Sequence, residues 1–441
     1  METSPPDRAE IDPENWWEAT SSVIRQALGD AGATGNDLAA VGLSGLMHAP
    51  VLIDAKGRSL LPAQLWLDQR CASQAAALKE RLAGHVPPLD LRTSVSAPKL
   101  AWIAENDPQA LAAASSVLLP KDFIRYRLTG DLATDISDAY GTGLFDLVQG
   151  AWMTDVAEAV GLLSTQLPLV RRADEPGGRI TAQGAASCGL SAGTPVATGG
   201  SDGLCARLGT GILPRGTKLI YLGTAAWVAV VDGTDEIGGI HAVDAGATTS
   251  TGAAMRWVRS ILAGPKGDRF DYAELDRLAK DVPPGSAGVM FFPHLMGERG
   301  PKNIPSATAA WTGLTLGHDQ SHMIRSVMEG TAFQLRMVLE DSFPTHAQTP
   351  VAARVTGGVC ASKLWLQIMA DVTGLSLEIP GEPETPAMGA ALLGGRAAGL
   401  VEQKLLWRNP IERVVVADPA AHREYDIAYK RFVTADQSLL G

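Results

Sequence analysis

A single aspartate surrounded by glycines is the first feature of this sequence that could do chemistry. Asp202 follows Gly199-Gly200-Ser201 and precedes Gly203, directly after an apolar run at 195–198 that predicts a short buried strand. A carboxylate in a glycine loop at a strand end can act as a general base, because glycine lets a substrate hydroxyl approach the backbone closely. Ser-Asp-Gly is also common in turns, so a plain solvated turn is the alternative interpretation.

Two further glycine turns follow predicted strands in the second half of the chain. Gly223-Thr224 separates strands expected at 218–222 and 228–231, and Gly357-Gly358 follows a strand expected at 354–356. Backbone amides and a hydroxyl at the tip of such a turn can hold phosphate oxygens. Gly-Thr is a common dipeptide, however, and does not identify a phosphate site by itself.

The elements that must position these residues alternate between strand and helix, which indicates the α/β class. Asp12-Pro13-Glu14 combines an N-cap, a first-turn proline and a first-turn acid, so a helix is expected to begin there. Strands are expected at 41–43 and, as a hairpin, at 50–54 and 60–66. The small residues around Gly389 predict a helix that another backbone can approach closely.

Composition limits the kind of protein that this can be. A chain of 441 residues is too long for one ordinary core, so two domains are expected. The net charge is −11 with no basic run, which argues against a nucleic-acid partner, although backbone amides could still bind a nucleotide. The four cysteines lie far apart and no apolar run could span a bilayer, so we expect a cytoplasmic protein without disulfides, a zinc site or a membrane segment.

Two long motifs resemble the signatures of the FGGY family of carbohydrate kinases, and most closely its xylulokinase-type members. Residues 94–106 (SVSAPKLAWIAEN) match the first signature, and 309–314 (AAWTGL) with 322–323 and 326–329 match the second. The resemblance extends over nearly all of the chain from Asp12 to Leu400 and includes 44–48 (SGLMH) and 65–70 (LWLDQR).

The resemblance implies a two-domain actin-like ATPase fold of the ribonuclease H-like type, with sugar and ATP meeting in an interdomain cleft. The expected domains are an N-terminal sugar-binding domain at 1–207 and a C-terminal ATP-binding domain at 208–441. Phosphoryl transfer to a pentulose such as xylulose, or to a related ketose or polyol, would use ATP and Mg²⁺ without a dedicated protein metal site. A homodimer is one assembly that fits this description.

The same resemblance assigns roles to particular residues. Asp202 would be the base that takes the proton from the sugar hydroxyl. The expected sugar-site residues are Met47, His48, Trp66 and Asp68. The expected ATP-site residues are Gly223 and Thr224 at the phosphates, with Gly357, Gly358, Ala361, Ser362 and Gly389 at the nucleotide.

Alternative interpretations remain for several of these residues. His48 could be an ordinary core or surface histidine, Trp66 could be a core residue, and Asp68 could form a local ion pair with Arg70. Two positions also depart from the xylulokinase pattern, since Gly203 and Leu46 stand where those enzymes usually have Asn and Gln. Both departures remove side-chain hydrogen bonds, so the motifs do not fix which sugar is used.

The largest departure from the family is at the start of the chain. Family members begin with a strand and an Asp-x-Gly-Thr hairpin that contacts the ATP phosphates, and none precedes Asp12 here. We expect that the start of the chain has been assigned too far downstream. The alternative is a first domain that is truncated at its N-terminus. The second case allows a catalytically silent protein that binds sugar or nucleotide; an actin-like polymer is the third and weakest alternative.

Overall fold

The computed structural model describes residues 8–211, 213, 215–234, 240–263, 271–298, 300–302, 304, 306–342, 352–402 and 407–440. The chain forms two compact units: unit 1 comprises Met1–Gly209 and Pro386–Leu405, and unit 2 comprises Thr210–Thr385 and Leu406–Gly441. The first division lies close to the boundary expected at residue 207. The return of Pro386–Leu405 to unit 1 is a feature that the sequence did not predict.

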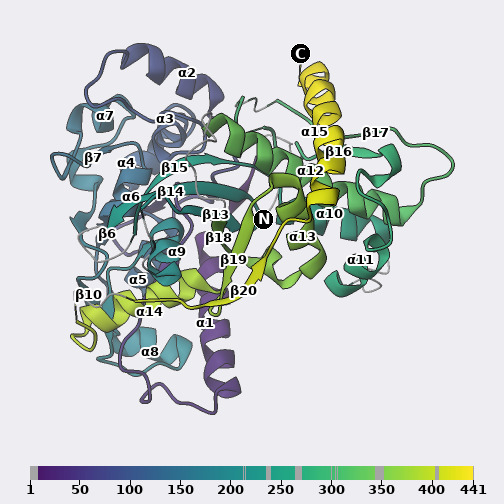
Figure 1. The fold of residues 1–441 in the computed structure, drawn as a ribbon. Helices are drawn as coiled ribbons and strands as arrows, with labels where there is room; N and C mark the ends of the chain where they lie inside the picture. Colours follow the sequence, from purple (N-terminus) through teal and green to yellow (C-terminus); the bar gives the residue numbers. More distant parts are fainter. Residues whose placement is uncertain are drawn as a thin grey trace. The chain divides into compact units, whose positions relative to one another are not determined.

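Unit 1 is built from short strands connected by helices (Figure 1). Its helices are α1 (Pro13–Asp30), α2 (Ala72–Arg81), α3 (Ser96–Asn106), α4 (Pro108–Ala113), α5 (Pro120–Thr129), α6 (Ile136–Gly141), α7 (Thr154–Ala159), α8 (Ala182–Cys188), α9 (Asp202–Thr210) and α14 (Thr385–Ala397). Its strands are β1 (Glu10–Ile11), β2 (Ser44–Gly45), β3 (Val51–Ile53), β4 (Ala63–Gln64), β5 (Ser116–Leu118), β6 (Ala133–Asp135), β7 (Phe145–Asp146), β8 (Ala151–Trp152), β9 (Leu169–Arg171), β10 (Pro176–Arg179), β11 (Pro195–Ala197) and β12 (Gly200–Ser201).

Local sequence chemistry explains the start of α1. The Asp12 side chain accepts the N–H of Glu14, and Pro13 occupies the first turn, as predicted. Trp17 is the buried anchor of this helix and packs with Phe123 of α5 in one core cluster of unit 1. The helix therefore packs the beginning of the described chain against the middle of unit 1.

The strands of unit 1 pair in twos, and several pairings differ from the expected ones. The expected strand at 41–43 is represented by a single bridge from Val41 to Val196, and the strand β2 follows it. The turn at 54–58 exists, but β3 pairs with β5 whereas β4 pairs with β1. Beside the turn, Ile53 bridges Ser59 and the Leu60 N–H donates to the Leu52 carbonyl oxygen at 2.9 Å. The hairpin prediction was therefore correct for the turn and the residues next to it, and wrong for Ala63–Gln64, which pairs with β1.

Unit 2 contains one six-stranded sheet in the order β15-β14-β13-β18-β19-β20. Its strands are β13 (Lys218–Leu222), β14 (Ala226–Thr234), β15 (Ile240–Ala247), β18 (Ala352–Thr356), β19 (Ser376–Pro380) and β20 (Ile411–Val415). A separate pair joins β16 (Met290–Phe292) to β17 (Ala310–Thr312). The helices are α10 (Gly252–Ala263), α11 (Tyr272–Ala279), α12 (Gln320–Ser342), α13 (Lys363–Thr373) and α15 (Pro419–Leu440).

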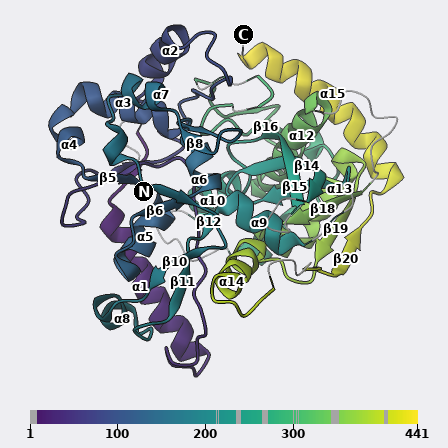
Figure 2. The ribbon, with the colours of Figure 1, turned by 90° about the vertical axis from the view of Figure 1, so that its left-hand side faces the viewer.

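Apolar residues of this sheet and of its helices form one core. Figure 2 shows β18, β19 and β20 side by side. The helix α13 contacts β19 and β20, and α15 packs on α13. Buried side chains such as Val228 in β14, Val327 in α12 and Phe432 in α15 belong to a single cluster. Within the described ranges of the chain, no helix is both long and apolar enough to cross a membrane.

Glycines let α14 pack directly against other backbone segments of unit 1, as the small residues around Gly389 predict. A Cβ added to Gly389 would lie 1.9 Å from the carbonyl oxygen of Cys205 in α9. A Cβ added to Gly42 would lie 1.6 Å from the carbonyl oxygen of Ala390. Neither position can accept a side chain unless the backbone moves, so Gly389 sets how closely α14 approaches α9, and Gly42 sets how closely it approaches the segment before β2.

This packing predicts that Gly389→Ala destabilises the protein. We expect the free energy of unfolding to fall by about 1–3 kcal/mol because the added methyl group overpacks the α14–α9 contact. Gly29→Ala is the matched control, because Gly29 also lies in a helix but an added Cβ there meets no atom within 4 Å. Urea denaturation of the two variants should show a loss for the first only, and equal stability would contradict this account of the packing.

Candidate active site

Two parallel strands of unit 1 bring the predicted base and the predicted sugar-binding turn to one edge. In the pairing of β2 with β12, Gly200 lies opposite Ser44 and Ser201 lies opposite Gly45. Parallel strands end at the same edge of a sheet, so the residues that follow them are neighbours. Met47 and His48 follow β2, and Asp202 follows β12.

Asp202 is the first residue of α9 and its side chain is exposed. The Ser201 hydroxyl accepts the N–H of Leu204 (3.2 Å), and Asp202 Oδ1 accepts the N–H of Gly203 (2.9 Å). The sequence predicted a loop here, but the Ser201 cap starts a helix instead. A helix N-terminus favours negative charge, which suits a carboxylate at the first position of α9.

His48 has a strained backbone, and two neighbouring groups contact the residue. Its φ of +73° is uncommon for a residue other than glycine. His48 Nδ1 lies 2.6 Å from the carbonyl oxygen of Gly141, and Lys99 Nζ donates to the His48 carbonyl oxygen at 2.9 Å. A carbonyl oxygen only accepts hydrogen bonds, so Nδ1 carries a hydrogen, and in a neutral ring Nε2 would then be the acceptor. Strain of this kind is typical of ligand-binding sites.

Gly141 also positions Met47. A Cβ added to Gly141 would lie 2.5 Å from Met47 Cε and 3.2 Å from His48 Cε1. Both predicted sugar-site side chains therefore pack directly on this glycine at the end of α6.

Asp68, in contrast, is occupied by a buried ion pair. Its carboxylate accepts Arg70 Nε at 2.8 Å and the N–H of Ala9 at 2.8 Å, and Arg70 also contacts Glu10. Of the two interpretations of Asp68, this geometry favours the ion pair. Trp66 is half-buried, and its contact with sugar stays a prediction.

Lys99 is a site residue that the sequence analysis missed. Its side chain is fully buried in α3, and Nζ donates to the carbonyl oxygens of His48 and Ser94 (2.7 Å for Ser94). Burial lowers the pKa of Lys99 to about 7, against smaller opposing effects of Cys71 and Asp68. The signal available in the sequence was the position of this lysine between Pro98 and Leu100, in an apolar turn of the helix.

In unit 2, the two predicted nucleotide turns also lie at one edge. The strands β13 and β18 are parallel, with Tyr221 opposite Thr356, and Gly223 and Gly357 follow their ends. Gly357 has φ +102°, and a Cβ added to it would lie 2.6 Å from the carbonyl oxygen of Leu222. Only glycine fits at this close approach of the two strand ends.

The Gly223-Thr224 turn rests on the N-terminus of α10. The Thr224 carbonyl oxygen accepts the N–H groups of Thr251 and Ala253, both at 3.0 Å. Arg256 donates to the Thr224 hydroxyl at 3.0 Å, and both side chains are exposed. The arginine, which the sequence analysis did not select, adds a cation that suits phosphate oxygens.

Beyond Gly357 the chain offers an open surface and a capped helix. Gly358 and Ala361 are exposed, and a Cβ added to Gly358 would meet no atom within 4 Å. Ser362 caps α13 by accepting the N–H of Trp365 (3.0 Å), and its hydroxyl donates to Asp276 (2.8 Å). Burial raises the pKa of Asp276, which the sequence analysis also missed.

Gly389 belongs to unit 1, whereas the two nucleotide turns belong to unit 2, and it packs against α9. The structure gives it a packing role, and its assignment to the nucleotide stays a prediction. In the part of the chain that the structure describes, no group of three or more His, Cys, Asp or Glu side chains could hold a metal ion.

The buried Lys99 predicts a pH-dependent stability difference between the protein and its Lys99→Met variant. Between about pH 7 and 10.5 the folded protein has released a proton that the unfolded chain still holds. The free energy of unfolding therefore rises with pH across this window, and the burial penalty is complete below pH 7. Relative to Lys99→Met, the stability of the unsubstituted protein should be flat below pH 6 and increase above pH 7.

Urea denaturation from pH 5.5 to 9.5 measures this difference. Lys79→Met in α2 is the control, because that side chain is exposed and should give no such slope. A pH-independent difference for Lys99→Met would show that Lys99 keeps its proton in the folded protein.

Comparisons with known proteins identify the family of this chain. Residues 1–209 match the N-terminal domain model of the FGGY family of carbohydrate kinases, and residues 224–398 match its C-terminal domain model. Xylulose kinase of Escherichia coli is 30% identical over 98% of this chain and 91% of its own. Gluconokinase of Bacillus subtilis is 28% identical over 82% of this chain and 75% of its own.

Solved structures show the same fold. The crystal structure of a xylulose kinase from Brucella ovis covers 99% of this chain with a TM-score of 0.78 and 28% identity, over 92% of its own length. The fold class predicted from the sequence, a two-domain α/β fold of the actin-like type, is confirmed. The chain therefore belongs to the FGGY family of carbohydrate kinases and is a phosphotransferase that acts on sugar hydroxyls with ATP.

Proposed function

We propose that this enzyme transfers the γ-phosphoryl group of ATP to a hydroxyl of a pentulose such as xylulose, or of a related ketose or polyol, with Asp202 as the general base. The parallel register of β2 and β12 carries the proposal, because it places Asp202 beside the Met47-His48 turn. Several relatives along most of the chain are xylulose kinases, which supports the choice of sugar.

In the proposed reaction, a sugar hydroxyl oxygen attacks the γ-phosphorus and its proton passes to the Asp202 carboxylate, while ADP leaves. His48 Nε2 is an acceptor that can orient a second sugar hydroxyl, and Met47 provides an apolar contact. Each group acts by position, which is the main source of catalysis in phosphoryl transfer.

The nucleotide would bind along the edge of β13 and β18. Thr224 and Arg256 offer a hydroxyl and a guanidinium to the phosphates, and the open surface at Gly358 and Ala361 can accept the adenosine. Mg²⁺ would enter with ATP and neutralise phosphate charge, a mode of binding that needs few protein ligands. Because ATP is an intracellular cosubstrate, the proposal places the reaction in the cytoplasm.

The sugar is tested with a panel of D-xylulose, L-xylulose, D-ribulose, xylitol, glycerol and D-gluconate, each with ATP and Mg²⁺. We expect the highest kcat/KM with a pentulose, and gluconate is included because a relative is a gluconokinase. A clear preference for gluconate or glycerol would overturn the sugar assignment. ATP binding without phosphorylation of any sugar would indicate a catalytically silent protein.

The base is tested with Asp202→Asn. The amide keeps the shape of the side chain but cannot take a proton, so we expect kcat to fall by about 10²–10⁴ while the sugar KM changes little. Asp155→Asn is the matched control, because Asp155 is also an exposed carboxylate in the first turn of a helix, α7. Near-normal turnover of Asp202→Asn would place the base elsewhere.

A further inference from the structure

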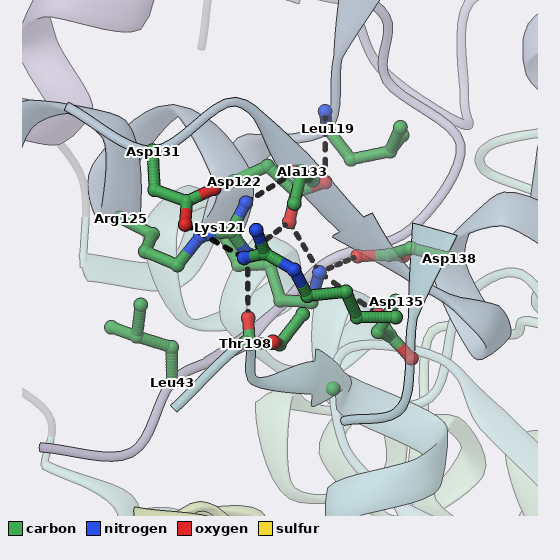
Figure 3. Close-up of polar contacts among 12 residues, drawn as sticks. Leu43, Leu119, Lys121, Asp122, Arg125, Asp131, Ala133, Asp135, Asp138 and Thr198 are labelled. Carbon is green, nitrogen blue, oxygen red and sulfur yellow. Dashed lines mark hydrogen bonds and ion pairs between the residues drawn. The ribbon is translucent and has the colours of Figure 1, made fainter. Parts of the chain in front are cut away.

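A buried cluster of charged side chains lies in unit 1 at the start of α5 (Figure 3). We name it the Lys121 cluster, and its members are Lys121, Asp122, Arg125, Asp135 and Asp138, all fully buried. Lys121 Nζ lies 2.6 Å from Asp122, 2.9 Å from Asp135 and 3.0 Å from Asp138. One lysine therefore joins α5, the end of β6 and α6.

The charges in this cluster do not balance by themselves. Arg125 pairs with Asp122 at 3.0 Å and donates to the carbonyl oxygen of Thr198 at 2.7 Å, so two cations face three carboxylates. Burial, with repulsion from Asp135 and Asp122, raises the pKa of Asp138. Buried ion clusters are often no more stabilising than apolar residues of similar volume, so stability alone does not explain this one.

The helix α6, which this cluster holds, touches both parts of the proposed sugar site. At its start, Asp135 Oδ2 accepts the Ser137 N–H (2.8 Å) and hydroxyl (2.5 Å). The Ser137 oxygen in turn accepts the N–H of Ser201 at 3.0 Å, and Asp202 is the next residue. This set of contacts connects the Lys121 cluster to the proposed base.

At its other end, α6 holds the sugar-binding turn. The Gly141 carbonyl oxygen contacts His48 Nδ1, and Met47 packs on the same glycine. The stem of Lys121 also lies against β2, since a Cβ added to Gly45 would be 2.8 Å from Lys121 Cβ. The six residues of α6 thus span from the β12–α9 junction to His48.

We infer that Lys121 is a positioning residue: by holding Asp135 and Asp138 it fixes α6, and α6 sets the separation between Asp202 and His48. The inference rests on the proposed function for the roles of those two residues. Neither Lys121 nor Ser137 needs to touch sugar or ATP, so both act through the groups that they hold.

Two variants separate positioning from simple stability. Ser137→Ala removes the contact with Ser201 and leaves the Lys121 ion pairs, so with D-xylulose, ATP and Mg²⁺ we expect kcat to fall about tenfold with the sugar KM within twofold. Lys121→Met releases both ends of α6, so it should lower kcat and also raise the sugar KM about tenfold, while the ATP KM stays within twofold.

Ser21→Ala is the matched control for the serine variant. Ser21 is a buried serine of α1 whose hydroxyl has no hydrogen-bond partner among the described residues, so its loss should leave both constants unchanged. Lower melting temperatures with kcat and sugar KM within twofold of the unsubstituted enzyme, in both test variants, would overturn the inference. If Lys121→Met does not fold, Ser137→Ala decides alone.

Amide hydrogen exchange supplies a readout that does not require activity. In Ser137→Ala, exchange should rise about tenfold in residues 200–204 and stay unchanged in 44–48; in Lys121→Met it should rise in both. If the unsubstituted chain phosphorylates no sugar but the two variants show this exchange pattern relative to it, the proposed function fails and the positioning of both segments by α6 stands. Unchanged exchange in both segments of both variants would overturn it.

Discussion

The pairing of parallel strands determines which residues of this enzyme can act together. In unit 1 the pairing of β2 with β12 brings Asp202 beside His48, although these residues are far apart in the chain. In unit 2 the pairing of β13 with β18 does the same for Gly223 and Gly357. A shift of one residue in either register would turn the following side chains to the opposite face.

Buried charge is the means by which unit 1 holds the residues of the proposed sugar site. The pairing of β2 with β12 is only two residues long, so few backbone hydrogen bonds support it. Lys99 holds the strained His48 by its carbonyl oxygen, and the Lys121 cluster holds α6 against both strands. Taking such groups from water costs several kcal/mol each unless they are fully paired. This cost is consistent with buried charges that fix the geometry of the proposed site more than they stabilise the fold.

Glycine contributes by permitting close approach. Gly389 lets α14 lie against α9, and Gly141 leaves room for both Met47 and His48. The helix α9, which starts with Asp202, is therefore positioned by its contact with α14 as well as by the Ser201 cap.

Features set by neighbouring residues could be predicted from the sequence, and features set by distant ones could not. The start of α1 was correct because Asp12-Pro13-Glu14 contains its own capping chemistry. The partner of β4 was wrong because pairing with β1 depends on the whole of unit 1. Family signatures identified the kinase, yet Lys99 and Lys121 were overlooked because a lysine in a helix is usually solvated.

The central claim is that Asp202 and His48 act on one sugar molecule at the edge of β2 and β12. A crystal structure of the enzyme with bound D-xylulose tests it most directly. We predict one sugar hydroxyl within about 2.6–3.2 Å of the Asp202 carboxylate, with a second hydroxyl bonded to His48 Nε2. A sugar bound without contact to either side chain would contradict the account.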